Sequence, residues 1–401
     1  MQIFAALSVV AYRRFWFAQV FSLIGSWLQA SAISWLVVTV LYPNQPALAT
    51  SQLGILTAIQ WTPSLLFSLF AGAVLDRVSR RTALLTSQVI LMCVAIGFTL
   101  VLGLKLASFP LVATLAFCAG MANVVDMVAR QSLVPSLVPR ELMSNAIALN
   151  TLAFNTTRVL GGALFGVVAP LGLTSIFLFN ALSFFGVIYA IWRIQIPQPA
   201  PKQSNLLEDI KIGLQYVRDN QAVATPILML LFLSLTVINF QLIIPTFARF
   251  ALNLEEGGFG LLSASFGVGA VTGAVIQAAF GVNKPGFMLW GALQLTSSML
   301  LLALSPTIYW AGLSLFLAGV GMNFFTVAAN STVQLSTPDH LRARAMSVYS
   351  LVFAGMSPPG SLFAGWLMAS LGSRGGIAVL GVLGLVSVLG LLPRLRRSTA
   401  L

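Results

Sequence analysis

Charge is scarce in this sequence, and histidine and cysteine are scarcer still. Only 7% of the 401 residues are Asp, Glu, Lys or Arg, whereas 58% are hydrophobic. An ordinary soluble protein carries roughly a quarter charged residues, so this composition excludes a water-soluble globule. His340 is the one histidine, and Cys93 and Cys118 both lie within apolar runs. We therefore expect no histidine-based site, no disulfide framework, no metal site and no cofactor.

Long apolar runs, by contrast, recur along the whole chain. Each has about 20 residues or more, enough to cross a hydrocarbon layer of roughly 30 Å as a helix. Divided at Pro, Gly and charged interruptions, the runs predict twelve transmembrane helices. Their ranges are 14–41, 50–75, 82–104, 109–131, 142–168, 172–193, 224–249, 258–281, 286–304, 307–333, 341–369 and 375–393. The sequence thus predicts an all-α membrane protein.

The basic residues are grouped at the ends of these runs. An even number of spans places both termini on one side of the membrane. If that side is the cytoplasm, only Lys105, Arg249 and Arg374 fall outside among the Lys and Arg residues of the loops. Because positively charged loops resist translocation, we expect a multi-pass protein of the cytoplasmic membrane with both termini inside. This topology explains the formal charge of +12, so no nucleic-acid partner is expected.

One long polar segment, 195–221, divides the chain into the halves 1–194 and 222–401. It begins as a Pro-rich linker and continues with apolar residues at helical spacing, Leu214 and Val217 among them, which predicts an amphipathic surface helix. Five residues recur 199 positions later: Pro139, Leu142, Ala146, Gly161 and Gly166 as Pro338, Leu341, Ala345, Gly360 and Gly365. Two homologous six-helix bundles are typical of a secondary transporter whose substrate binds between them.

A charged pattern lies between the second and third spans. It reads G-x-x-x-D-R-x-x-R-R and consists of Gly72, Asp76, Arg77, Arg80 and Arg81. The pattern resembles the loop signature of the major facilitator superfamily, with Ser79 where a glycine usually precedes the arginine pair. Residues 126–150 and 342–365 are similar to the branch that contains the enterobactin exporter and macrolide efflux proteins. The resemblance implies the major facilitator fold, with two pseudo-symmetric bundles, and export of a drug- or siderophore-like amphipathic molecule by alternating access.

In the superfamily, the turn after span two latches the cytoplasmic side shut in the outward-facing state. The resemblance implies that Asp76 faces the start of span eleven, while Arg77 or Arg81 reaches Asp126 in span four. Asp126 and Arg130 are four residues apart on one helix face, which permits an ion pair. Two interpretations of Asp126 stay open: a member of this latch, or a group that is protonated during transport.

Arg158 lies near the middle of span five, with no acid within two turns of its own helix. A charge at the membrane centre costs roughly 2.5–3.5 kcal/mol on insertion scales, so its side chain is expected to face protein or water. Two interpretations stay open here as well. Arg158 tethers span five to span four, through Asp126, or it contacts an anionic group of the substrate.

The resemblance also implies that spans one, four, seven and ten line the cavity. It thereby nominates polar and aromatic residues of those spans: Trp27, Gln29, Asn123, Asn239, Gln241, Asn323, Phe324 and Asn330. Drug–proton antiporters of the superfamily often carry an acid in span one, whereas 15–38 has none. Protons are therefore only a candidate coupling ion.

The sequence bears on three other functions. An importer or uniporter of a small metabolite is the alternative within transport. A channel would need polar rings along a continuous pore, and an enzyme would need a metal cluster, a nucleophile–base pair or a nucleotide loop; the sequence shows none of these patterns. We expect a monomeric carrier that contacts membrane lipids and a small-molecule substrate.

Overall fold

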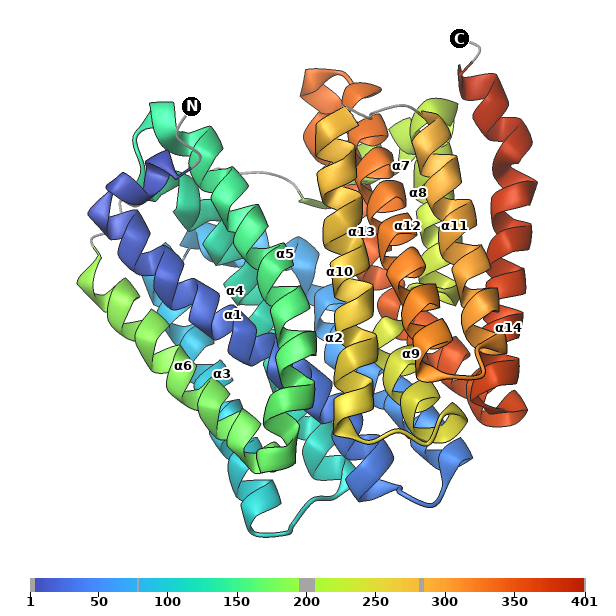
Figure 1. The fold of residues 1–401 in the computed structure, drawn as a ribbon. Coiled ribbons are helices and arrows are strands. Elements are labelled where there is room, and N and C mark those ends of the chain that lie inside the picture. Colours follow the sequence, from blue (N-terminus) through green and yellow to red (C-terminus); the bar gives the residue numbers. More distant parts are fainter. Residues whose placement is uncertain (1–3, 78, 195–205, 281–284, 400–401) are drawn as a thin grey trace.

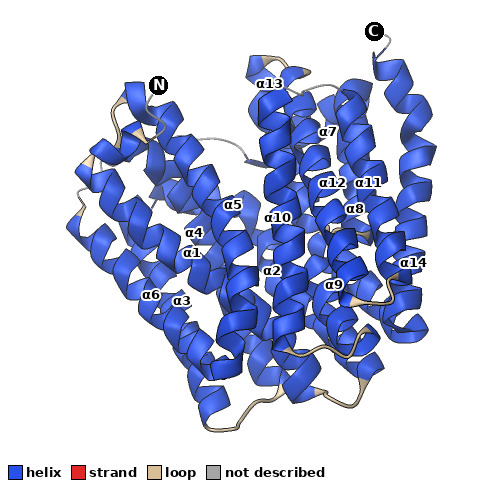
Figure 2. Cartoon of the chain, in the orientation of Figure 1, coloured by secondary structure: helices blue, strands red, loops and turns tan. Residues whose placement is uncertain are grey.

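The described residues fold mostly into helices, and Figure 2 shows no strand among them. This computed structural model describes residues 4–77, 79–194, 206–280 and 285–399. Within these ranges, the side chains at 68–77, 131, 132, 135, 206–210, 285 and 396–399 are outside the description. The predicted all-α class is confirmed.

Six long helices form the first half (Figure 1). They are α1 (Val10–Leu36, extended by a π-helical turn, Val37–Leu41), α2 (Pro46–Arg77), α3 (Arg80–Gly103), α4 (Phe109–Leu133), α5 (Met143–Val168) and α6 (Leu173–Arg193). Local signals fix two of the starts. The Ser79 hydroxyl caps α3 by accepting a hydrogen bond from the Thr82 N–H at 3.0 Å, and Gly172 precedes α6 with a φ of 97°.

The remaining helices belong to the linker and the second half. They are α7 (Leu206–Asp219), α8 (Gln221–Thr236), α9 (Phe240–Thr246, extended by a π-helical turn, Phe247–Ala251), α10 (Glu256–Phe280), α11 (Pro285–Leu304), α12 (Ile308–Leu335), α13 (Asp339–Gly355) and α14 (Ser357–Thr399). α14 is two helices joined at Gly372, whose φ of 73° and ψ of 165° are not helical.

The helices account for twelve membrane spans. Ten helical segments of the described residues are long and apolar enough to cross a membrane. Adding α2 and dividing the last of the ten, Asp339–Leu395, at Gly372 gives the twelve spans that the sequence predicts. The protein is a multi-pass membrane protein built from two six-helix bundles.

Two spans of the second half are interrupted. Span seven breaks between α8 and α9, where the Asn239 amide donates hydrogen bonds to two carbonyl oxygens in the last turn of α8, each at 3.2 Å. Span eleven breaks at Met356, two residues before Pro358 and Pro359. Proline has no backbone N–H and clashes with the preceding turn, which accounts for a break at this position.

The halves repeat the same internal packing at the first pair of duplicated glycines. Gly161 of α5 lies against Trp27 of α1, and Gly360, 199 positions later in α14, lies against Ser234 of α8. In each half, the glycine lets the fifth span approach the first span of that half closely. The repeated glycines therefore have the same packing role in both halves.

The second duplicated pair joins the two halves. Gly166 of α5 meets Gly260 of α10, and Gly365 of α14 meets Gly54 of α2. A Cβ on Gly365 would lie 3.0 Å from the Gly54 Cα, so backbone lies directly against backbone. Any side chain there would force the helices apart. The two crossings are equivalent under the duplication and hold the bundles together.

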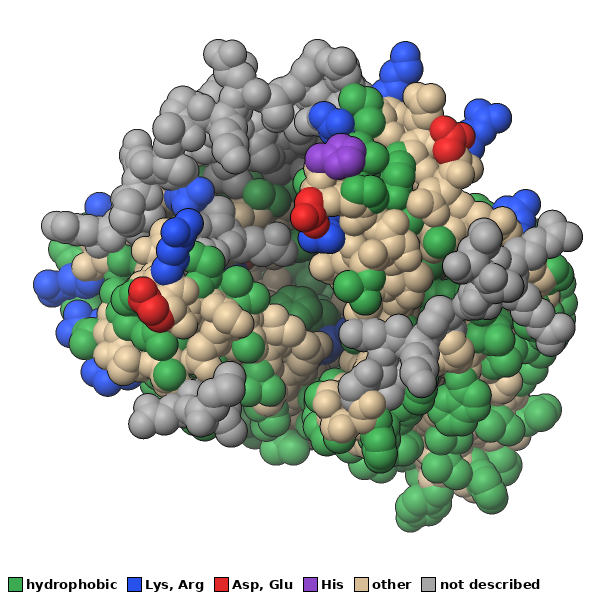
Figure 3. Space-filling model, turned by 90° about the horizontal axis from the view of Figure 1, so that it is seen from above, with side chains coloured by type: hydrophobic (Ala, Val, Ile, Leu, Met, Phe, Trp, Pro, Cys, Tyr) green, Lys and Arg blue, Asp and Glu red, His purple; other side chains and the backbone are tan. Residues whose placement is uncertain are grey.

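Both crossings lie toward the same end of the molecule, which is termed the sealed face. Both chain termini lie at the other end, the termini face, where the bundles diverge (Figure 1). Viewed onto the termini face, the molecule is hollowed between the bundles, with hydrophobic side chains in the depth (Figure 3). The molecule is closed at one face and open at the other.

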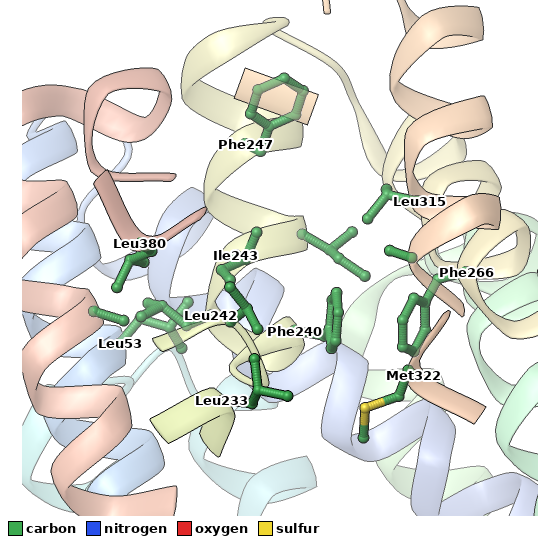
Figure 4. Close-up of a cluster of buried hydrophobic side chains, with 14 of the residues drawn as sticks. Leu53, Leu233, Phe240, Leu242, Ile243, Phe247, Phe266, Leu315, Met322 and Leu380 are labelled. Carbon is green, nitrogen blue, oxygen red and sulfur yellow. The ribbon is translucent and has the colours of Figure 1, made fainter. Parts of the chain in front are cut away.

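An apolar cluster around α9 strengthens the closure. Leu242 and Ile243 of α9 are fully buried, and Leu53 of α2 lies beside them (Figure 4). On the other side of α9, Phe240 faces Phe266 of α10, with ring centroids 4.0 Å apart. Since α2 belongs to the first half, this core runs across the boundary between the bundles.

Arg374 holds helix ends together at the sealed face. Its Nη1 donates hydrogen bonds to the carbonyl oxygens of Ala303 and Ser305, at 3.0 and 2.6 Å, where α11 ends. Its guanidinium also lies 5.3 Å from the centre of the Phe247 ring. Carbonyl groups at a helix C-terminus attract a cation, so this basic residue has a structural role.

The linker contains the helix α7, which packs on α13. The Tyr216 hydroxyl donates a hydrogen bond to the carbonyl that follows α12, at 3.1 Å, and Gly213 lies against the Arg344 carbonyl. Val217 is buried, whereas Leu214 is 50% exposed. Residues three and four apart share a helix face, so the packed face is the one with Gly213, Tyr216 and Val217.

Replacing Gly260 by valine is expected to loosen the sealed face. The new side chain has no room against Gly166, and overpacking of this kind costs about 1–3 kcal/mol. The measurement is the distance between spin labels at Leu171 and Asn253, which are exposed at this face on opposite halves, after both native cysteines are replaced by serine. We expect longer distances in the variant.

Gly257→Val is the matched control, on the same helix one turn earlier. A Cβ at Gly257 meets nothing within 4 Å, so the distances should stay those of the parent. If Gly260→Val also leaves them unchanged, this crossing does not hold the halves together.

Candidate functional site

An aromatic cluster, termed the seal, closes the space between the bundles near the sealed face. Trp35 of α1 stacks on Phe259 of α10 with ring centroids 5.0 Å apart, and Phe165 of α5 meets Phe259 edge-on at 5.0 Å. The Trp35 Nε1 donates a hydrogen bond to Glu256 Oε1 at 3.1 Å. All three rings are buried. The seal joins two helices of the first half to one of the second and ends the hollow on this side.

A second layer lies on the same three helices, nearer the termini face. Trp27, Arg158 and Phe266 are seven or eight residues from the seal residues of α1, α5 and α10. Two helical turns correspond to about 10 Å, so this layer follows the seal toward the hollow. The Arg158 guanidinium carbon lies 5.6 Å from the centre of the Trp27 ring and 5.5 Å from that of Phe266. A cation is thus held between aromatic rings of opposite halves.

Arg158 has no counter-charge. Within the described ranges, no carboxylate forms an ion pair with it, and none of its guanidinium N–H groups donates a hydrogen bond. Contact with aromatic rings is worth about 0.5–2 kcal/mol, but it leaves the charge and the five donors unsatisfied. This side chain can therefore bind an anionic group through charge and hydrogen bonds together.

Asp126 and Arg130 form the ion pair that their spacing permits. Arg130 Nε lies 2.7 Å from Asp126 Oδ2, and both side chains are buried. The other oxygen, Oδ1, accepts hydrogen bonds from Gln88 Nε2 at 2.6 Å and Ser87 Oγ at 3.3 Å, both on α3. Asp126 is thereby fully engaged between α3 and α4. It is not paired with Arg158, so the tether through Asp126 is not formed in this structure.

The signature between spans two and three lies at two helix ends. α2 ends at Arg77 and α3 begins at Arg80. The side chains of Gly72, Asp76 and Arg77 are outside the described residues. The contact expected between Asp76 and the start of span eleven therefore stays a prediction.

Arg81 of the signature contacts the end of α6. Its Nη2 donates a hydrogen bond to the Trp192 carbonyl at the C-terminus of α6, at 2.5 Å. Asp126 pairs with Arg130 and not with Arg81. The latch is expected to form when the termini face is closed, whereas this structure is open there. In this open arrangement, Arg81 caps the C-terminus of α6.

The cavity candidates of the first half lie in different settings. Gln29 is buried, and its Oε1 accepts a hydrogen bond from Asn180 Nδ2 of α6 at 2.8 Å, so it packs inside the bundle. Asn123 of α4 is exposed at mid-span, as is Asn155 of α5. Since an amide in contact with hydrocarbon is costly, these exposed side chains fit the hollow better than the lipid.

The candidates of span seven contact protein. Asn239 serves the break between α8 and α9, where its amide binds backbone carbonyls. Gln241 Oε1 accepts a hydrogen bond from Trp61 Nε1 of α2 at 3.4 Å, which links the halves. In this state both side chains are occupied by protein contacts.

The candidates of α12 point to different neighbours. Phe324 is buried against two aromatic rings of α11, so it packs within the second half. Asn330 Oδ1 accepts a hydrogen bond from Gln334 Nε2 at 2.6 Å. Asn323 lies beside Gly273 of α10, and its buried Oδ1 has no hydrogen-bond partner in the described part of the chain. Of these three, Asn323 keeps an acceptor available.

Seven site residues were not foreseen from the sequence: Trp35, Phe165, Phe259, Phe266, Glu256, Ser87 and Gln88. Gln88 carried a usable signal, because a polar amide within an apolar run is usually buried against a polar partner. The phenylalanines carried none, since aromatic residues in membrane spans commonly face lipid. No group of three or more His, Cys, Asp or Glu side chains suited to a metal occurs in the described ranges. The site can bind and orient a ligand through charge and ring contacts.

Comparison with known proteins identifies the family. The family model described as "Transmembrane secretion effector" matches residues 1–400. The multidrug efflux pump Tap of Mycolicibacterium fortuitum is 26% identical over 392 residues, 93% of each chain. The staphyloferrin A transporter of Staphylococcus aureus is 21% identical over 357 residues, 87% of each chain.

Solved structures share the fold. The POT family transporter PepTSo superposes with a TM-score of 0.79 at 10% identity, covering 98% of this chain and 99% of that one. A D-xylose–proton symporter gives 0.72 at 16% identity, covering 94% and 97%. The relatives are transporters of small molecules and not enzymes. The chain therefore belongs to the transmembrane secretion effector family of the major facilitator superfamily of transporters.

Proposed function

We propose that the protein exports an amphipathic small molecule, drug-like or siderophore-like, across the cytoplasmic membrane by alternating access. The observation that carries this proposal is the unpaired Arg158 between two rings of opposite halves, on the open side of the seal. A site between two bundles that is accessible from one face at a time suits this mechanism.

The termini face is proposed to be cytoplasmic. Most basic loop residues lie at the ends of spans on that side, as positive-inside topology requires. Arg374, an exception, is bound by helix-end carbonyls at the sealed face. With this orientation, the structure represents an inward-open state. The boundaries 1–194, 195–221 and 222–401 are retained as the proposed division into bundle, linker and bundle.

Export is favoured over import by the comparisons. The family is described as a secretion effector, and one relative is named a multidrug efflux pump. Protons are the candidate coupling ion. Asp126 is the buried carboxylate among the described residues, but its two oxygens already have three partners. A carboxylate with this many partners suits the latch better than a site that is protonated in every cycle.

Arg158 is proposed to contact an anionic group of the substrate. A charge that is shielded from water and has no partner is costly. Arg158 has no carboxylate partner among the described residues, so a bound anion would compensate its charge. In that complex, Trp27 and Phe266 contact the apolar part of the same molecule. The site thus suits an amphipathic anion.

The function is tested by efflux. Proteoliposomes or intact cells are loaded with siderophores, macrolides, dyes or lipids, and efflux is followed with and without a pH gradient. Saturable outward flux of at least one class, accelerated by an inward proton gradient, supports a proton-coupled exporter. Net uptake instead would show an importer, and flux that does not saturate would show a channel.

Arg158→Gln is expected to weaken transport of anionic substrates selectively. A hydrogen bond to a charged group contributes about 1.5–3 kcal/mol, so the apparent affinity for an anion should fall by about tenfold or more. Arg158→Lys, which keeps the charge but loses the planar donors, should lose less. Transport is measured for an anionic and a neutral compound side by side. Equal losses for both compounds would leave Arg158 a structural role only.

Asp76→Asn is expected to impair the transport cycle by destabilising the outward-open state. A neutral side chain loses the attraction to the positive end of span eleven, typically 0.3–1 kcal/mol in exposed settings and up to about 2 when partly buried. Accessibility of single cysteines on both faces measures the balance of states, and efflux measures the cycle. Glu141→Gln, at an exposed acid of the same half, is the control. Unchanged accessibility and efflux in Asp76→Asn would refute the latch.

A further inference from the structure

A cavity away from the central hollow lies between α1 and α6. Its volume is about 490 Å³, and it is lined by Arg14, Ala18, Gly186, Tyr189, Ala190 and Arg193. Arg14 is four residues into α1 and Arg193 ends α6, so the cavity lies where both spans reach the termini face. This position corresponds to the boundary between hydrocarbon and headgroups.

The cavity is positively charged and has no acid in its lining. Arg14 and Arg193 are both exposed, and neither forms an ion pair with a described carboxylate. The Arg193 guanidinium lies 5.3 Å from the centre of the Tyr189 ring and 5.4 Å from that of Trp192. These rings orient the guanidinium without neutralising it. No negative charge in the lining therefore balances the two arginines.

Helix packing explains why there is room between them. Gly25 of α1 lies directly against Asn180 of α6, so the two helices touch toward mid-membrane. Toward the termini face they part: a Cβ on Gly186 would meet nothing within 4 Å. The small side chains of Ala18 and Ala190 extend this opening. The result is a recess whose mouth carries both arginines.

The surface around the recess is apolar. Phe17 and Phe21 of α1 and Phe185 of α6 are exposed by 50%, 60% and 61%. Trp192, at 60%, and Tyr189, at 58%, lie at the end of α6, where aromatic residues of membrane proteins gather at the interface. An occupant is therefore in contact with acyl chains on one side and basic groups on the other.

We propose that this recess binds the headgroup of an anionic phospholipid. The phosphate lies between the Arg14 and Arg193 guanidinium groups, and the acyl chains follow the exposed phenylalanines of α1 and α6. Charge complementarity, the interfacial position and the apolar surroundings fit a lipid, whereas a free phosphate would use only the arginines. Basic pockets between spans are a known type of lipid headgroup site.

Titration of the purified full-length protein with phosphatidylglycerol or phosphatidylcholine, read by native mass spectrometry, tests the proposal. We expect tighter binding of phosphatidylglycerol. Each arginine removed should weaken it about fivefold, so Arg14→Gln with Arg193→Gln should approach 25-fold. Gly186→Leu, which fills the recess and keeps both charges, should weaken it as well. That substitution has room, so the variant is expected to fold.

Arg13→Gln with Arg140→Gln is the matched control, because it removes the same charge from exposed arginines outside the cavity. An equal loss in this control, or no loss in Gly186→Leu, would reduce the effect to general surface charge and overturn the site. Displacement of bound lipid by millimolar inorganic phosphate would assign the recess to a free anion and overturn the lipid. These measurements do not involve transport, so they are independent of the proposed export.

Discussion

Backbone contact between glycines at two crossings, α5 with α10 and α2 with α14, is the constraint on which the rest of the structure depends. At these points the halves approach as closely as helices can, which brings α1, α5 and α10 near enough for one stack of rings to close the space between them. The bundles then diverge toward the termini face (Figure 1). The layer that contains Arg158 lies where closure gives way to the hollow, and its position follows from the same contact.

The buried charges show two ways in which a membrane protein holds ions. Asp126 and Arg130 form a pair with net charge zero, and α3 supplies further hydrogen bonds to the carboxylate, so each charge has a partner. Arg158 has rings around it and no carboxylate partner among the residues that the structure describes. Isolated charges are costly in hydrocarbon and are retained where they serve a function. This difference in pairing, more than depth in the membrane, separates a structural charge from a candidate binding group.

Sequence reasoning predicted what is local or repeated. The twelve spans follow from run length, and the Asp126–Arg130 pair follows from its spacing of four. Sequence reasoning could not predict which residues of other helices these residues contact. The repeat contains Gly166 and Gly365 but neither Gly260 nor Gly54, which they touch. Similarly, no periodicity indicates that Trp27 and Phe266 meet at one guanidinium, because these contacts depend on how two bundles are placed.

The attachment of α7 has a mechanical consequence. Tyr216 and Gly213 fix this helix to α12 and α13, so it is part of the second half, although the sequence marks it as a linker. Under the proposed alternating access, a helix held in this way moves with the second half, so its contacts with α12 and α13 are the same in both states.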